Sequence, residues 1–228
     1  QGQLSQGIAA TATETRLPVV VIDTADGVDV VDKVNKIDAK LNIRNSTESN
    51  PDENAAITIK GRWNASWGMP KKSYTVKLEN KSKVLGMKKH KTWALIANYS
   101  DKTLLRNSIA YEMGREIYDN MKWNPNTRNV HFILNGEYLG VYMLTESVKI
   151  DSNRIDVPNL EDYAEDVLED STITPEDYGF LLEVNARLDE NFNFTTTKGV
   201  KFSLKEPDGA DISDDLKEFI KTTTQNAE

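Results

Sequence analysis

The chain has 228 residues, of which 38% are hydrophobic and 28% are charged, a composition typical of a globular protein that buries a core. Acidic residues outnumber basic ones by 36 to 28, and the formal net charge of −8 argues against nucleic acid as the main partner. The chain has no cysteine, which excludes disulfide bonds, cysteine-ligated zinc and cysteine nucleophiles, and no apolar run reaches the length of a membrane span.

The N-terminal part predicts a flexible segment followed by two strands. Residues 1–16 are polar and rich in small side chains, which is typical of an unfolded end. The β-branched run from Leu17 to Ile22 predicts a short buried strand, with a turn after it at Asp26 and Gly27. From Ile37 to Ile43, apolar and polar residues alternate, which predicts a second strand.

Two further strands flank a loop of small and aromatic residues. Residues 57–60 alternate in polarity, and Tyr74, Val76 and Leu78 place one face of the next strand in a core. A glycine-bearing hairpin loop can bring backbone N–H groups and lysine charge to an anion. Because neither GxxxxGK[ST] nor GxGxxG is present, a surface hairpin with solvated lysines fits equally well. The basic patch that could hold a nucleotide consists of Lys71, Lys72, Lys77, Lys81 and Lys83.

A helix and a hairpin are predicted next. Residues 93–97 predict a buried strand, and the polar residues 98–101 supply a helix N-cap. Asn135 and Gly136, between two apolar runs, predict a tight hairpin. On the helix an apolar residue recurs at every fourth position, which predicts a stripe that faces the core, formed by Leu105, Ile109, Met113 and Ile117.

The C-terminal part predicts an acidic insertion, two strands and a helix. Residues 159–177 carry eight acidic residues and no lysine or arginine, which suits calcium or a basic partner but is more simply a solvated insertion. Residues 179–184 predict a strand, with residues 202–205 as its partner. Leu216, Phe219 and Ile220 mark the apolar side of a final helix.

Several of these segments, in this order and spacing, resemble the spore coat protein H (CotH) kinase family. They are the loop after Lys60, residues 84–87, residues 93–107 and residues 135–146, and the resemblance runs from about Leu17 to the region of Pro207. It implies ATP binding with a divalent metal such as Mg²⁺ and phosphorylation of hydroxyl groups on a Ser/Thr-rich protein. It also implies a secreted or cell-surface bacterial protein.

The resemblance implies an α+β fold of the atypical protein-kinase type. We expect a nucleotide-binding small lobe over residues 17–148, made of an antiparallel sheet and one main helix. The start of a second lobe follows over residues 149–228 and includes the acidic insertion 159–177.

The resemblance also implies nucleotide-contacting residues. Arg62 and Ser66 fall in the phosphate-covering loop, and Lys72 or Lys77 neutralises the phosphates, although a solvated surface role suits both lysines as well. The other members of the implied set are Glu112, which pairs with that lysine; Arg106, which contacts phosphate or braces the helix; and the segment from Glu146 to Val148, which meets the adenine.

No catalytic residue is predicted within the chain. The family's catalytic and metal-binding carboxylate segments match nothing up to Glu228, so we expect the 228-residue chain alone to transfer no phosphate. The alternative is a surface-exposed binding, adhesion or structural module that keeps the scaffold without catalysis.

Overall fold

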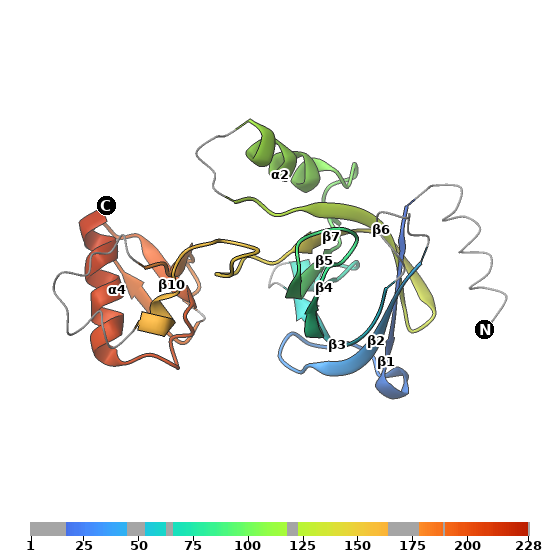
Figure 1. The fold of residues 1–228 in the computed structure, drawn as a ribbon, viewed down its shortest axis with the longest axis horizontal. Coiled ribbons are helices and arrows are strands. Elements are labelled where there is room, and N and C mark those ends of the chain that lie inside the picture. Colours follow the sequence, from blue (N-terminus) through green and yellow to red (C-terminus); the bar gives the residue numbers. More distant parts are fainter. Residues whose placement is uncertain are drawn as a thin grey trace. The chain divides into compact units, whose positions relative to one another are not determined.

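The computed structural model describes residues 17–44, 53–62, 66–117, 123–163, 178–188 and 190–227. The chain divides into two compact units, Gln1–Ser147 and Val148–Glu228, which are described separately below (Figure 1). The predicted flexible segment 1–16 and residues 164–177 of the acidic insertion lie outside the described residues.

The first unit is a closed β-barrel of seven strands in the order β1-β2-β3-β4-β5-β7-β6, counted over the described residues (Figure 1). Each strand pairs antiparallel with its neighbours except β1 and β6, which run parallel. The strands are β1 (Val19–Thr24), β2 (Ile37–Arg44), β3 (Glu53–Arg62), β4 (Ser73–Ser82), β5 (His90–Ile96), β6 (Thr127–Leu134) and β7 (Glu137–Glu146). Two short 3-10 turns, η1 (Ala25–Gly27) and η2 (Ser66–Gly68), interrupt the connections.

The expected kinase-like small lobe, an antiparallel sheet with one main helix, is wrong. Strand β1 bonds to β2 on one side and to β6 on the other, with Val20 beside Phe132, so the sheet closes on itself. The described residues hold two α-helices, α2 (Arg106–Glu116) and α4 (Asp214–Ala227). The β1–β6 pairing joins segments more than a hundred residues apart, and a pairing at that distance leaves no local pattern in the sequence.

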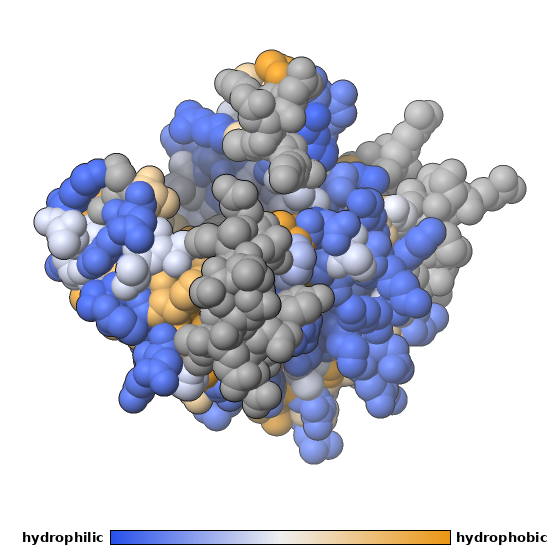
Figure 2. All heavy atoms as spheres, turned by 60° about the vertical axis from the view of Figure 1, so that its left-hand side comes forward, coloured by the Kyte–Doolittle hydropathy of each residue, from blue (hydrophilic) through white to orange (hydrophobic). Residues whose placement is uncertain are grey.

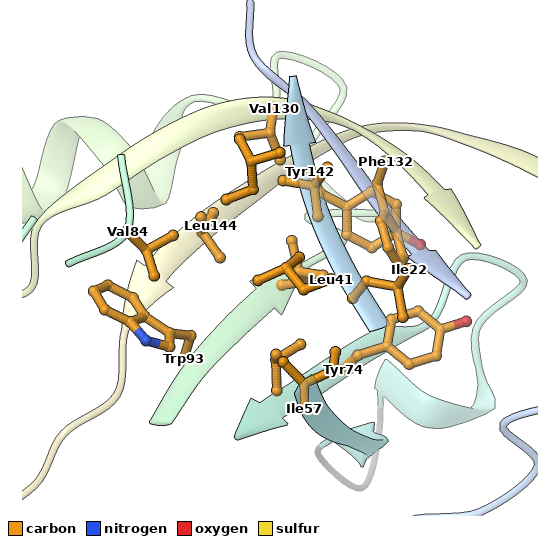
Figure 3. Close-up of a cluster of buried hydrophobic side chains, with 14 of the residues drawn as sticks. Ile22, Leu41, Ile57, Tyr74, Val84, Trp93, Val130, Phe132, Tyr142 and Leu144 are labelled. Atoms are coloured by element: carbon orange, nitrogen blue, oxygen red, sulfur yellow. The ribbon is translucent and has the colours of Figure 1, made fainter. Parts of the chain in front are cut away.

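The barrel interior is the main core of this unit. Alternate residues of every strand point inward, as the period of two requires. Figure 3 shows side chains from different strands converging there, among them Ile22, Leu41, Trp93 and Phe132. The largest fully buried side chains of this core include Trp93, Phe132 and Tyr142, so aromatic side chains fill much of the space.

The hairpin turn predicted at Asn135 and Gly136 is confirmed. Both residues have positive φ, 49° and 81°, as a tight turn between β6 and β7 needs. The side-chain oxygen of Asn135 accepts a hydrogen bond from the backbone N–H of Thr24 at 2.9 Å. The turn is thereby tied to the end of β1, next to the parallel pair that closes the barrel.

Helix α2 lies outside the barrel, and its predicted buried stripe is wrong. The helix packs on the barrel through Tyr111, which contacts a small cluster formed by Ala94, Ile96 and Met143, and Gly114 is its buried residue. Apolar surface is visible at the top of Figure 2, where Figure 1 places α2. The stripe residues are exposed by 43% for Leu105, 53% for Ile109, 43% for Met113 and 60% for Ile117.

The exposure of Ile109 leads to a stability prediction. We expect Ile109→Ala to change the free energy of unfolding by no more than about 0.5 kcal/mol, because the side chain buries little surface. Arg115→Ala should cost about 1–2 kcal/mol, since its guanidinium group donates to the carbonyl oxygen of Pro125 and so ties α2 to the start of β6. Urea unfolding followed by tryptophan fluorescence compares the stabilities of the two variants. A larger loss of stability in Ile109→Ala than in Arg115→Ala would show that the stripe faces the core after all.

The second unit has its own sheet and core. The sheet has the order β8-β10-β9, and β8 pairs antiparallel with β10 as predicted. Helix α4 covers the core with Leu216 and Ile220, so its predicted apolar side is confirmed. The strands and the 3-10 turn of this unit are β8 (Leu181–Val184), β9 (Asn193–Thr195), β10 (Lys201–Glu206) and η3 (Leu160–Tyr163).

Neither α2 nor α4 combines the length and the apolar character that a membrane span needs, and the same holds for every helix of the described residues.

Candidate functional site

Three cations lie on the outer side of the part of β3 and β4 where the two strands pair. The register places Lys77 opposite Thr58 and Lys60 opposite Thr75, with Arg62 at the end of β3. Since the alternate residues of both strands point into the barrel core, these side chains point away from it. We call this surface the β3–β4 basic face, and it consists of Lys60, Arg62 and Lys77 with the hydroxyl groups of Thr58 and Thr75.

Two cations of the β3–β4 basic face, Lys60 and Lys77, are not held in ion pairs within the part of the chain that the structure describes. The guanidinium group of Arg62 donates to the hydroxyl oxygen of Thr75 at 3.3 Å, which holds it along the strand. Cations fixed on one face of a sheet, with hydroxyl donors between them, suit a phosphate group.

The loop between β3 and β4 folds back onto the end of β3. The Gly61 N–H donates to the carbonyl oxygen of Asp32 at 2.8 Å, and the ring of Trp67 lies against the same glycine. A Cβ atom at Gly61 would come within 2.6 Å of both, so the close approach requires glycine. Trp67 also meets Tyr74 edge-on, with ring centroids 6.1 Å apart. The hydroxyl of Ser66 is buried in this loop without a hydrogen-bond partner among the described residues.

The two candidate phosphate lysines have different surroundings. The Lys72 ammonium group donates to the carbonyl oxygens of Trp67 and Met69, at 2.6 and 3.0 Å, so it binds its own loop. It also lies 5.1 Å from the centroid of the Trp67 ring. Lys77 is exposed on the β3–β4 basic face. Of these two lysines, between which the sequence left the choice open, Lys77 is the exposed one and Lys72 is bonded to its own loop.

Lys71, which sequence analysis placed in the basic patch without a role, is half-buried. Its ammonium group donates to the carbonyl oxygens of Ala97, at 3.0 Å, and Val141. The nitrogen lies 4.3 Å from the centroid of the Tyr142 ring. Burial lowers the pKa of Lys71 below its ordinary value. Its side chain thus points into the protein rather than onto the β3–β4 basic face.

Two predicted site residues of α2 have partners close in sequence. The exposed carboxylate of Glu112 pairs with the less exposed Arg115, three residues later. The guanidinium group of Arg106 is largely exposed and lies 3.5 Å from the Asp101 carboxylate. That carboxylate also accepts the backbone N–H of Arg106 at 2.9 Å, and this hydrogen bond is the main reason why the pKa of Asp101 is lowered. The Asp101 carboxylate thus holds the start of the helix through the Arg106 backbone, and the predicted role of the Arg106 side chain stays a prediction.

The predicted adenine-contacting segment begins with a buried carboxylate. Glu146, at the end of β7, is 2% exposed and accepts hydrogen bonds from the backbone and side-chain nitrogens of Asn126, at 2.9 and 3.1 Å. Its carboxylate therefore fixes the chain just before β6. Val148 is exposed and belongs to the second unit.

The described residues give an incomplete fit to a metal-dependent phosphate ligand. The β3–β4 basic face suits a phosphate group. No group of three or more His, Cys, Asp or Glu side chains in the described ranges could hold a metal ion.

Comparison with known proteins identifies the family. A search of curated proteins finds no match. The family model described as CotH kinase protein matches residues 57–228, which is more than half of the chain and extends from β3 to the end of α4. On that match, the chain belongs to the CotH kinase family.

Proposed function

We propose that this chain is the nucleotide-binding part of a CotH-type, ATP-dependent protein kinase, and that the β3–β4 basic face binds the phosphates of ATP. In this proposal Lys60 and Lys77 neutralise the phosphates, and Arg62 orients them beside the loop. Mg²⁺ accompanies the nucleotide, the substrate is a protein rich in Ser and Thr, and the protein acts outside the cell or at its surface.

The observation that carries the proposal is the pair of lysines without ion-pair partners among the described residues. Ion pairs between exposed cations and carboxylates add little stability to a protein. A phosphate that contacts two or three fixed cations is attracted by each of them, so these contacts raise its binding affinity. Family membership supplies ATP as the natural candidate for the phosphate donor.

The test is a calorimetric titration with ATP and Mg²⁺. We expect Lys60→Ala with Lys77→Ala to weaken binding about 30-fold, since each lost charge contact removes about 1 kcal/mol of attraction near the surface. The matched control combines Lys89→Ala with Lys201→Ala, which removes the same charge from two other exposed positions. The control should bind ATP with nearly unchanged affinity.

Two results would overturn the proposal in different ways. Equal affinities of the two double variants would place the phosphates away from the β3–β4 basic face. No detectable binding by the unmodified chain would favour the non-catalytic surface module instead.

A further inference from the structure

The Lys71 side chain ties the C-terminal end of the loop between β3 and β4 to the rest of the barrel. Lys71 donates hydrogen bonds to the carbonyl oxygens of Ala97 and Val141, which lie 26 and 70 residues away in sequence. Ala97 follows β5 directly, and Val141 belongs to β7. One ammonium group thus ties the loop to two other strands of the barrel.

This ammonium group is half-buried, and no carboxylate pairs with it among the described residues. The groups that the described part of the chain places around its nitrogen are two carbonyl oxygens and the face of the Tyr142 ring. A half-buried cation is unfavourable unless neighbouring dipoles or an aromatic face compensate it. Both kinds of compensation are present here, so the position is specific for a cation that can donate several hydrogen bonds.

Further hydrogen bonds hold the rest of the loop beside the Lys71 side chain. The Tyr142 hydroxyl donates to the carbonyl oxygen of Lys72 at 2.8 Å, next to the Lys71 side chain. Within the loop, the Met69 N–H donates to the carbonyl oxygen of Ser66 at 3.1 Å, and Lys72 binds two loop carbonyls. These contacts fix the described residues of the loop, 66–72, against the barrel without any ligand.

We propose that Lys71 is a positioning residue, whose contacts with the Ala97 and Val141 carbonyls set the β3–β4 loop in its ligand-ready conformation without touching phosphate. This inference rests on the proposed function, because it concerns the same nucleotide site. A loop ordered before binding loses little entropy when the ligand arrives, and affinity is higher for that reason. In this arrangement the Lys77 ammonium group attracts the phosphates, and Lys71 holds the loop in position.

The test compares Lys71→Met with Lys77→Met, which remove the same charge from the two lysines. Hydrogen exchange of the Met69 amide, measured by NMR without nucleotide, reports the order of the loop. We expect Lys71→Met to speed this exchange about tenfold and to weaken ATP binding about tenfold, while Lys77→Met leaves the exchange unchanged.

Salt dependence separates a positioning residue from a phosphate ligand. Added salt screens the attraction between the phosphates and each cation that contacts them. We expect the affinity of Lys71→Met to fall with salt as steeply as that of the unmodified chain, and that of Lys77→Met to fall less steeply. A weakened salt dependence in Lys71→Met would make Lys71 a direct ligand and overturn the inference, as would unchanged exchange at Met69.

A second variant covers the case in which Lys71→Met fails to fold. Tyr142→Phe keeps the ring beneath Lys71 but removes the hydroxyl that binds the Lys72 carbonyl. Faster Met69 exchange in Tyr142→Phe supports the anchor, and unchanged exchange contradicts it. If the unmodified chain binds no ATP, the proposed function fails, while the exchange measurement still decides whether Lys71 orders the loop.

Discussion

Phe132→Ala should destabilise the barrel by about 3–5 kcal/mol, because it removes a fully buried aromatic side chain and leaves a cavity. The ring packs against Tyr142 and Tyr74, with centroids 5.0 and 5.7 Å apart (Figure 3). Its strand, β6, joins β7 on one side and β1 on the other. The substitution therefore weakens both the core and the closure of the barrel.

Tyr99→Ala is the matched control for Phe132→Ala. Tyr99 is also aromatic but is 50% exposed, so its loss should cost no more than about 0.5 kcal/mol. All four tryptophans of the chain lie before Ser147, so tryptophan fluorescence in a urea titration reports the first unit. Similar midpoints for the two variants would show that Phe132 does not fill the barrel core.

Local patterns predicted most strands, because the alternation of apolar and polar residues lies within the strand itself and the turn residues lie directly beside it. The alternation from Ile37 to Ile43 corresponds to β2, and the Asn135–Gly136 turn joins β6 to β7. Closure of the barrel was not predictable in this way. It depends on β1 lying parallel to β6, and nothing in the residues 19–22 distinguishes an edge strand from one paired on both sides.

The error on α2 has a geometric cause. A helix turns by about 100° per residue, so a strict spacing of four residues drifts by about 40° at each step. From Leu105 to Ile117 the drift reaches about 120°, so these residues spread over about a third of the helix circumference. Ser108, Tyr111 and Arg115, spaced by three and then four, stay within about 60° and form the less exposed side. The helix therefore packs on the barrel through Tyr111 and the buried Gly114, and the apolar residues at every fourth position stay exposed.

The candidate site was predictable where strand periodicity applies. Lys77 alternates with Val76 and Leu78, so its outward direction follows from the sequence. Lys71 and Lys72 lie at the end of a loop, where no period assigns a direction. Their contacts with Ala97, Val141 and Trp67 depend on how the loop folds, and therefore required the structure.

Gly61→Ala should destabilise the first unit by about 1–3 kcal/mol, the usual cost of an added methyl group in a filled space. The new Cβ atom would meet the Asp32 carbonyl oxygen and the Trp67 ring at 2.6 Å, and the Asp32 oxygen is backbone that already accepts the Gly61 N–H. The ring must therefore move, and with it the loop. A shift of tryptophan emission together with a lower urea midpoint would report this movement.

Gly68→Ala is the control within the same loop. A Cβ atom at Gly68 meets nothing within 4 Å, so the free energy of unfolding of this variant should lie within about 0.5 kcal/mol of that of the unmodified chain. We expect the two variants to differ in stability because the Trp67 ring lies against Gly61, whereas nothing lies close to the Cβ position of Gly68. Equal midpoints for the two variants would mean that the loop does not lie against the end of β3, and the contacts of Lys71 would then have nothing to hold in place.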